Sequence, residues 1–327
     1  MKSILKKLQI LVLALFMALG GISGSVIAAE QSSSTADNNY ILSNYHSRHI
    51  GQSVHQNQSN STINTVNLPA NAEKSGNWAG YIVTPASQSD AYTSVSGNWT
   101  VPNISANQQN ALAAQWIGLG GVNSEDLLQM GTIEEIEDGQ PVANVFWEKL
   151  PDASQNIMSI PIGSTISVTI SKTSDSTWNL TFTATTPEGE TIGKTISTTL
   201  DSSYEQGIGT SAEWISEDPS NQYNQLLPLA NTDTVKYQSA KANGNSLNDS
   251  SNEVHPVAMV SGNGNIAIYP SEIGTDGESF TATTNSTSTG NISSIPNFRH
   301  RPGSFPGHIS VYPGGYTHPG QRAAVGY

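Results

Sequence analysis

Two neighbouring segments near the middle of the chain alternate strictly between apolar and polar residues. Every second side chain is apolar in both: Ile166, Val168 and Ile170 in residues 164–171, and Trp178, Leu180, Phe182 and Ala184 in residues 177–186. A period of two places such side chains on one face of a β-strand, and the polar stretch KTSDS between the segments favours a turn. The two segments therefore predict an antiparallel hairpin that buries one face.

Short runs of this β-type recur from about Ser75 to about Thr284, and polar turns separate them. No segment shows a long helical periodicity, and the tetrapeptide SGNW occurs twice without extending into a repeat array. Many short alternating strands in one domain predict an all-β fold, an antiparallel two-sheet β-sandwich. Because the chain contains no cysteine, we expect a large hydrophobic core to stabilise this domain without disulfides.

The two ends of the chain differ in composition from this central region. Three lysines precede an apolar run that is too short to span a membrane, and small residues follow, which predicts a signal peptide over residues 1–29. Residues 30–74 are rich in Ser, Asn and Gln and are interpreted as a largely disordered leader or propeptide. Residues 285–327 form a low-complexity tail rich in Pro, Gly and His. We therefore expect an exported chain with one β-sandwich domain over residues 75–284.

The chain is strongly acidic. It has 13 Lys and Arg against 26 Asp and Glu, a net charge of −13. Such a surface repels nucleic acids and anionic membranes, so we expect neither as a partner of the mature protein. Because carboxylates become neutral as the pH falls and basic groups are few, little self-repulsion builds up in acid. The composition therefore suits work at low pH, and together with the signal peptide we expect a secreted, extracellular protein, which we expect to be a monomer.

The sequence lacks the signatures of several enzyme classes. It contains no G-x-S-x-G nucleophile elbow, no H-E-x-x-H zinc helix, and no D-T-G or D-S-G motif of aspartic proteases. There is also no phosphate loop or dinucleotide fingerprint, and we expect neither a cofactor nor a metal. Within residues 75–284 the one histidine is His255, and a lone histidine beside a proline is more often structural than catalytic.

Three segments combine tryptophans with acids or amides. They are AAQWIGLGGVNSEDLLQMG with Trp116 and Gln129, ANVFWEKLP with Glu148, and SAEWISEDPS with Glu217. Each segment taken alone also fits a core tryptophan and a solvated carboxylate or amide. In the last segment, strand alternation predicts that Glu213 and Glu217 share one face of a strand and that Trp214 lies on the opposite face.

In order, spacing and local sequence, these segments together with SGNWAGYIV and SGNWTVP resemble the glutamic peptidases (eqolisins, peptidase G1 or A4-type), typified by secreted fungal acid proteases. The resemblance covers residues 76–219 well and the rest of the domain loosely. It implies an antiparallel two-sheet sandwich of the concanavalin A or lectin-like jelly-roll type, with a substrate cleft across the concave sheet. It also implies a catalytic dyad of Gln129 and Glu217, and substrate-binding or supporting roles for Asn77, Trp78, Trp116 and Glu148.

The chain departs from the fungal pattern at several positions. Gly120 stands where the fungal enzymes carry an aspartate, Leu150 stands where they carry a tyrosine, and the fungal cysteines are missing. The resemblance therefore implies the reaction but not the cleavage specificity.

The chemistry of peptide hydrolysis assigns a role to each member of this dyad. The reaction needs an activated water, a donor to the developing oxyanion and a proton for the leaving amine. Ionised Glu217 would take a proton from the water and return it to the amine. The amide of Gln129 would orient the water and donate to the oxyanion, since it trades no proton at ordinary pH. These roles predict a glutamic-type endopeptidase that hydrolyses polypeptide substrates in acid.

Two alternatives remain open at the level of sequence. A lectin-like carbohydrate-binding module on the same sandwich would use exposed tryptophans, Trp78, Trp99 and Trp116, to stack on sugars. A glycoside hydrolase would use two carboxylates, for instance Glu148 and Glu217. The glycosidase needs Glu148 as its second acid, whereas the peptidase needs Gln129.

Overall fold

The structure, a computed structural model, describes residues 66–106, 110–221 and 225–286. The predicted signal peptide, most of the predicted leader and nearly all of the predicted tail lie outside these described residues. Within them, the chain forms β-strands almost throughout, with one helix of seven residues, so the expected all-β class is confirmed.

The strands follow one another along the chain at short intervals. In the first half they are β1 (Glu73–Ser75), β2 (Trp78–Pro85), β3 (Ser94–Thr100), β4 (Leu112–Gly120), β5 (Leu127–Glu137), β6 (Gln140–Lys149), β7 (Gln155–Ile160) and β8 (Thr165–Lys172). In the second half they are β9 (Thr177–Thr185), β10 (Thr191–Thr199), β11 (Ala212–Glu217), β12 (Thr234–Ala242), β13 (Asn245–Ser246), β14 (Asn252–Val260), β15 (Ile266–Pro270) and β16 (Phe280–Thr284). The helix α3 (Ser202–Ile208) lies between β10 and β11.

The predicted hairpin is present. β8 and β9 pair antiparallel from Thr165 opposite Thr185 to Lys172 opposite Trp178. The apolar side chains of both strands are buried and their polar neighbours are largely exposed or half-buried, as the alternation predicted.

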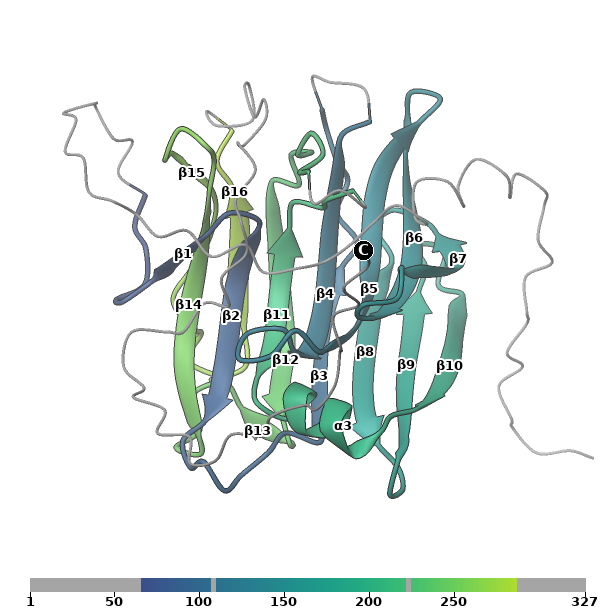
Figure 1. The fold of residues 1–327 in the computed structure, drawn as a ribbon. Helices are drawn as coiled ribbons and strands as arrows, with labels where there is room; N and C mark the ends of the chain where they lie inside the picture. Colours follow the sequence, from purple (N-terminus) through teal and green to yellow (C-terminus); the bar gives the residue numbers. More distant parts are fainter. Residues whose placement is uncertain (1–65, 107–109, 222–224, 287–327) are drawn as a thin grey trace, which may run out of the picture.

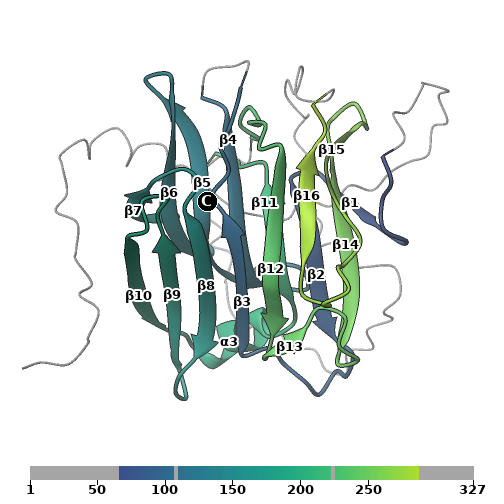
Figure 2. The same cartoon turned by 180° about the vertical axis from the view of Figure 1, so that it is seen from behind.

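A single path of hydrogen-bonded strands runs through the molecule, in the order β10-β9-β8-β3-β12-β16-β15-β14-β2-β11-β4-β5-β6-β7. The two short strands off this path are β1, which pairs with β14, and β13, which pairs with β12. The pairing is antiparallel apart from β1 with β14. The sheet curls so that β8 lies across from β5 and β3 across from β4, as the opposite views in Figures 1 and 2 show.

One strand explains why the fold differs from the expected pair of separate sheets. The first half of β12 pairs with β16 and its second half pairs with β3, with an irregular register between Gln238 and Lys241. This irregularity lets one strand hydrogen-bond on both sides of the bend, which β-bulges commonly allow. The mostly antiparallel architecture is therefore confirmed as one curled sheet, a half-barrel, and the two-sheet jelly roll is not confirmed.

The main hydrophobic core lies inside the curl, between the facing strands. Its largest buried side chains come from both sides: Trp99, Trp178, Phe182, Trp214 and Tyr237. A second apolar cluster covers the opposite face of β2, β11, β4, β5 and β6, and includes Trp78, Trp116, Phe146 and Ile215. These five strands are therefore buried on both faces, and functional side chains on them are held rigidly.

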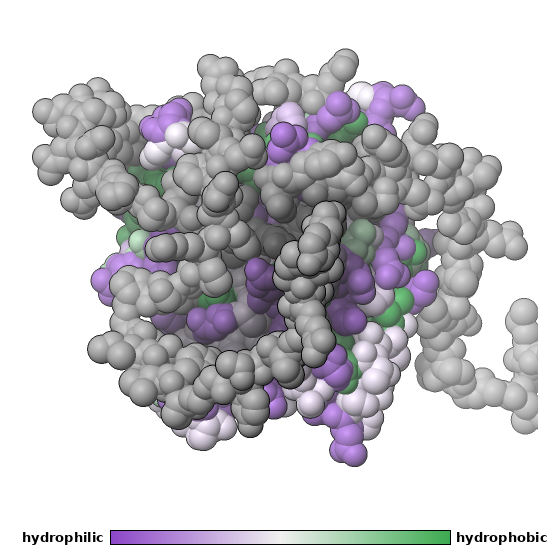
Figure 3. Space-filling view, viewed as in Figure 1, coloured by the Kyte–Doolittle hydropathy of each residue, from purple (hydrophilic) through white to green (hydrophobic). Residues whose placement is uncertain are grey.

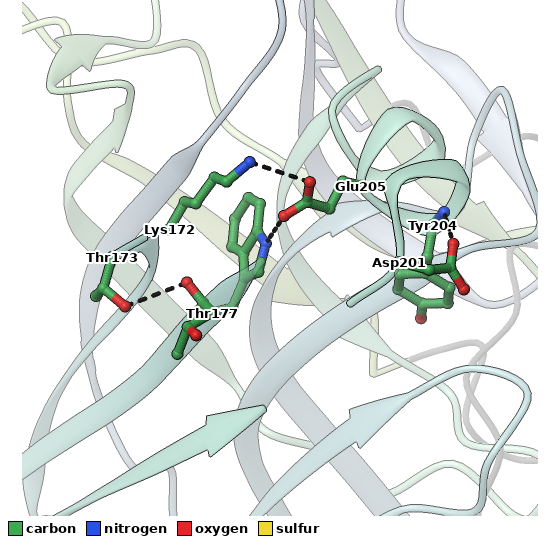
Figure 4. Close-up of polar contacts among 7 residues, drawn as sticks. Lys172, Thr173, Thr177, Asp201, Tyr204 and Glu205 are labelled. Carbon is green, nitrogen blue, oxygen red and sulfur yellow. Dashed lines mark hydrogen bonds and ion pairs between the residues drawn. The ribbon is translucent and has the colours of Figure 1, made fainter. Parts of the chain in front are cut away.

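The helix α3 is capped at its start by Asp201 and is attached to the sheet through Tyr204 and Glu205. Asp201 caps it by accepting a hydrogen bond from the backbone N–H of Tyr204 (2.9 Å), and Glu205 accepts from Trp178 Nε1 (2.8 Å) and Lys172 Nζ (3.0 Å) (Figure 4). The hydrogen bond from Trp178 is the main reason that the pKa of Glu205 is lowered. The hydroxyl of Tyr204 donates to the backbone carbonyl of Leu127 (2.7 Å), so the helix holds the first residue of β5.

On the side viewed in Figure 1, the described surface is mainly hydrophilic, with smaller hydrophobic areas between (Figure 3). No helix among the described residues is long and apolar enough to cross a membrane.

Candidate active site

The candidate residues lie on one face of five adjacent strands, with Asn77 directly before the first of them. β11 pairs with β2 on one side and with β4 on the other, and β5 and β6 follow in the same sheet. Trp78, Trp116 and Ile215 belong to the apolar cluster on this face, and strand alternation places Gln129, Glu148 and Glu217 on it as well. We call this the site face.

The carboxylate of Glu217 is fully buried and held by two donors. Asn77 Nδ2 donates to Oε1 (3.1 Å) and Trp116 Nε1 donates to Oε2 (2.7 Å). Asn77 is itself placed by Ser75, whose hydroxyl accepts from the backbone N–H groups of Asn77 (3.3 Å) and Trp78 (3.0 Å). One donor on each oxygen suits an ionised carboxylate, which only accepts hydrogen bonds.

Gln129 is also fully buried, and one partner fixes its amide. Its Nε2 donates to Oε2 of Glu148 at 2.5 Å, from the neighbouring strand β6. Its Oε1 has no hydrogen-bond partner among the residues that the structure describes. The contact leaves one polar atom of the Gln129 side chain able to bind a group that enters the site.

The indole of Trp116 occupies the space between Glu217 and Gln129. The indole nitrogen donates to Glu217, and the opposite edge of the ring lies over Gly118. A Cβ added to Gly118 would lie 2.9 Å from Trp116 Cζ3 and 3.3 Å from Gln129 Cβ, so the ring and Gln129 are close to each other. A Cβ at Gly131, in β5, would collide with the backbone oxygen of Gln115 and with Cα and Cβ of Trp116. Gly118 is therefore required by the close approach of the Trp116 ring, and Gly131 by the close approach of the β4 backbone. Trp78 packs edge-on against the Trp116 ring, with ring centroids 4.9 Å apart.

Several other carboxyl groups are buried near these strands. Burial raises the pKa of Glu134 to about 8 and that of Glu135 to about 7, and it raises the pKa of Glu213 well above its ordinary value. The pKa of Asp218 is also raised well above its ordinary value, first by burial and then by the adjacent charge of Glu217. The folded state therefore favours the protonated forms of these four groups.

We expect the folded state to be most stable in acid. A carboxyl whose pKa is raised on folding contributes stability that is complete below its ordinary value, about 4.5, and that is lost as the pH rises through 7 to 8. Glu134 and Glu135 should each lower the free energy of unfolding by on the order of a few kcal/mol between pH 4 and pH 8, and Glu213 and Asp218 act in the same direction. Calorimetry across this range should show a falling melting temperature, and a constant one would contradict the assignment.

The structure brings all six predicted site residues close together, and it also places His255. Asn77 and Trp116 contact Glu217, Glu148 contacts Gln129, and Trp78 supports Trp116. His255 lies in β14, where it contacts Thr84 and Glu73, which fits the structural role expected for it.

Sequence analysis missed Ser75 as the residue that places Asn77. The signal was available, because Ser75 and Asn77 belong to the same SGNW tetrapeptide.

Both alternative functions lose support from this geometry. Trp78, Trp99 and Trp116 are at most 1% exposed, so none of them presents a ring face to a sugar. Glu148 and Glu217 lie on β6 and β11 with two strands between them, a lateral separation of about 14 Å at ordinary strand spacing. That separation exceeds the roughly 5–10 Å between the carboxyl groups of glycosidases.

A match to a family model shows to which protein family this chain belongs. The model described as the Peptidase A4 family matches residues 76–292, which include every residue of the candidate site. The chain belongs to the Peptidase A4 family. This family membership supports a peptide hydrolase, and it confirms the resemblance that the motifs indicated.

Two individual comparisons agree with this family. Aspergillopepsin-2 of Aspergillus niger is 29% identical over 206 residues, which cover 56% of this chain and 70% of that protein. The crystal structure of scytalido-glutamic peptidase with a transition state analog inhibitor aligns with a TM-score of 0.51 and 20% identity, over 64% of this chain and 98% of that one. The second likeness supports the fold of this chain as that of a glutamic peptidase.

Proposed function

We propose that this protein is a secreted acid endopeptidase in which Glu217 and Gln129 act as the catalytic pair. The observation that carries the proposal is the arrangement around Trp116: one edge of its ring binds the Glu217 carboxylate and the other lies beside Gln129. A carboxylate and an amide are thus oriented toward one buried, largely apolar region, where polar interactions are stronger than in water.

In the first step Glu217 acts as a general base. Its carboxylate, oriented by Asn77 and Trp116, takes a proton from a water that attacks the substrate carbonyl carbon. The new carbon–oxygen bond leaves negative charge on the former carbonyl oxygen. An N–H of the Gln129 amide donates to that oxyanion, while its Oε1 accepts from the attacking water.

In the second step Glu217 acts as a general acid. The proton that it took from the water passes to the amide nitrogen, the carbon–nitrogen bond breaks, and the amine leaves. Glu217 is then ionised again and a new water completes the cycle. Glu148 holds the Gln129 amide through Nε2, and in this role it is a positioning residue that does not exchange protons with the substrate.

We expect this pair to work in acid. A carboxylate base stays ionised down to about pH 4, where a histidine base would be protonated and inactive. Purified mature protein should cleave casein faster at about pH 4 than at pH 7, and the Glu217→Gln variant should be inactive at both. Cleavage that is fastest at neutral pH, or that survives in the variant, would contradict the proposal.

Secretion and removal of the leader belong to the same proposal. The predicted signal peptide ends near residue 29, and β1 begins at Glu73, directly before the SGNW tetrapeptide that places Asn77. A cut near residue 74 would divide β1 but would keep Ser75 and all six site residues in the mature chain. N-terminal sequencing of active protein from the culture medium should find a start close to this point, and active protein that retains the whole leader would contradict it.

A further inference from the structure

A group of polar side chains lies inside the curl of the sheet, on the face of β4, β5 and β11 opposite to the site face. Gln115 is paired with Thr132 on one side and with Ser216 on the other, and Glu134 follows Thr132 by two residues on the same face of β5. Gln115, Thr132 and Glu134 are 0% exposed. The surroundings are the main hydrophobic core, so these polar groups have no access to bulk solvent.

Four polar atoms of this group have no hydrogen-bond partner among residues 66–106, 110–221 and 225–286. They are both amide atoms of Gln115 and both carboxyl oxygens of Glu134. Leaving even one such atom unpaired in an apolar interior costs about 1–3 kcal/mol, so four unpaired atoms together would threaten the stability of a domain. Native proteins satisfy such groups with buried water, which commonly makes about three hydrogen bonds.

Strand register places the two side chains close to each other. Gln115 and Glu134 are diagonal neighbours on adjacent strands, which places their Cβ atoms about 7–8 Å apart. The residues paired with Glu134 on either side are Ala113 and Ala143, whose side chains are short. The carboxyl and the amide therefore lie within reach of one bridging water, and the side chains beside Glu134 on the two neighbouring strands are short.

From this arrangement we propose that Gln115 and Glu134 form a buried water-binding site, in which a neutral Glu134 carboxyl is the form that holds the water. A neutral carboxyl donates one hydrogen bond and accepts others, and the Gln115 amide donates and accepts as well. A water between them can therefore both donate to and accept from these two side chains. An ionised Glu134 would place an unpaired charge in the core. The site thus makes the folded state depend on the protonation of one residue.

The other groups that face Glu134 do not neutralise its charge. β4 contributes Ala113, β6 contributes Ala143, and β12 contributes Tyr237, whose own pKa is raised by burial. On β5 itself, the hydroxyl of Thr132 lowers the pKa of Glu134, but by less than burial raises it. The pKa of Glu134, raised by burial to about 8, agrees with a neutral carboxyl in acid and at neutral pH.

The water-binding site is linked to the strand that carries Glu217. The hydroxyl of Tyr237 donates to the backbone carbonyl of Ile215 (2.6 Å) and lies 3.1 Å from the hydroxyl of Ser216. These contacts hold β11 from inside the curl, while Glu217 projects from its other face. Ionisation of Glu134 should therefore disturb β11 together with the core, at a pH above the range proposed for catalysis.

A crystal structure of the protein at acid pH, at a resolution that shows ordered water, tests the site directly. We expect at least one water within hydrogen-bond distance of both the Gln115 amide and the Glu134 carboxyl. Direct contact between the two side chains, or a space without water, would overturn the proposal. In solution, water relaxation dispersion should show fewer long-lived waters in the Gln115→Leu, Glu134→Leu double variant than in the wild type, and an equal number would overturn it as well.

The role of protonation is tested by Glu134→Gln, which cannot ionise and keeps a side chain of similar size. The midpoint of unfolding in alkaline solution, followed by circular dichroism, should rise by at least about half a pH unit, with little change at pH 4. Glu188→Gln, at an exposed position in the turn between β9 and β10, is the matched control and should leave the midpoint unchanged. An unchanged midpoint in Glu134→Gln would show that this carboxyl does not set the limit. Neither measurement depends on peptidase activity.

Discussion

Replacing Glu217 with glutamine is expected to lower kcat/KM for peptide hydrolysis by at least 100- to 10,000-fold, the usual contribution of a general acid–base group. Glutamine keeps the shape of the side chain and can still accept from Asn77 or Trp116, but it cannot take a proton from water. The fold should survive, and the circular dichroism spectrum at pH 4 should match that of the wild type. Rates measured on a fluorogenic peptide would quantify the loss.

The structure offers a matched control for this variant. Glu205→Gln changes another glutamate that accepts from an indole N–H, that of Trp178, but it lies on α3 away from the site face. Its activity should remain close to that of the wild type. If Glu217→Gln retained more than a tenth of the wild-type rate, or if both variants lost activity equally, Glu217 would not be the catalytic base.

Replacing Gln129 with alanine is expected to lower kcat by about 100- to 1,000-fold and to change KM much less. The amide is proposed to donate to the oxyanion, which exists only after the water attacks, and one such donor contributes this much in other hydrolases. An interaction made only in the transition state affects kcat and leaves substrate binding nearly unchanged. Steady-state kinetics at pH 4 on a single peptide substrate would separate the two parameters.

The contact between Gln129 and Glu148 provides the second half of this test. Glu148→Gln removes an ionisable carboxyl but retains an oxygen that can accept from Nε2 of Gln129, so it should lose about 10-fold or less. A loss in Glu148→Gln as large as in Gln129→Ala would indicate that Glu148, and not the amide, acts on the reacting atoms. A rise in KM alone in Gln129→Ala would show that Gln129 only binds substrate.

Much of the fold could be predicted because alternation is a local property. The apolar residues Ile166, Val168 and Ile170 predicted one buried strand face, and the structure buries all three. The same pattern predicted that Glu213 and Glu217 share a face, with Trp214 opposite, and Trp214 does lie in the main core. The closure of the sheet could not be predicted, because it depends on β12 pairing with two different strands on either side of an irregular register.

The burial of the acidic residues could not be predicted from the local sequence pattern either. The run GTIEEIE looks like a polar strand end, yet Glu134 and Glu135 are 0% and 2% exposed. Charged residues are usually solvated, so composition favours the surface for both. β4 and β6 pair along both sides of β5, so Glu134 is buried on the inner face of this strand and Glu135 on the opposite face.

The sequence by itself determined the family, the strands and the two residues proposed for catalysis, because motifs and alternation are properties of short segments of the chain. The tertiary structure alone decided how Glu217 is held, since its donor Asn77 is 140 residues away and its donor Trp116 is 101 residues away. It also decided that Gln129 is fixed by Glu148 and that Gln115 and Glu134 meet inside the core. The physical reason is strand register, which sets the neighbours of every side chain and depends on pairing between distant segments.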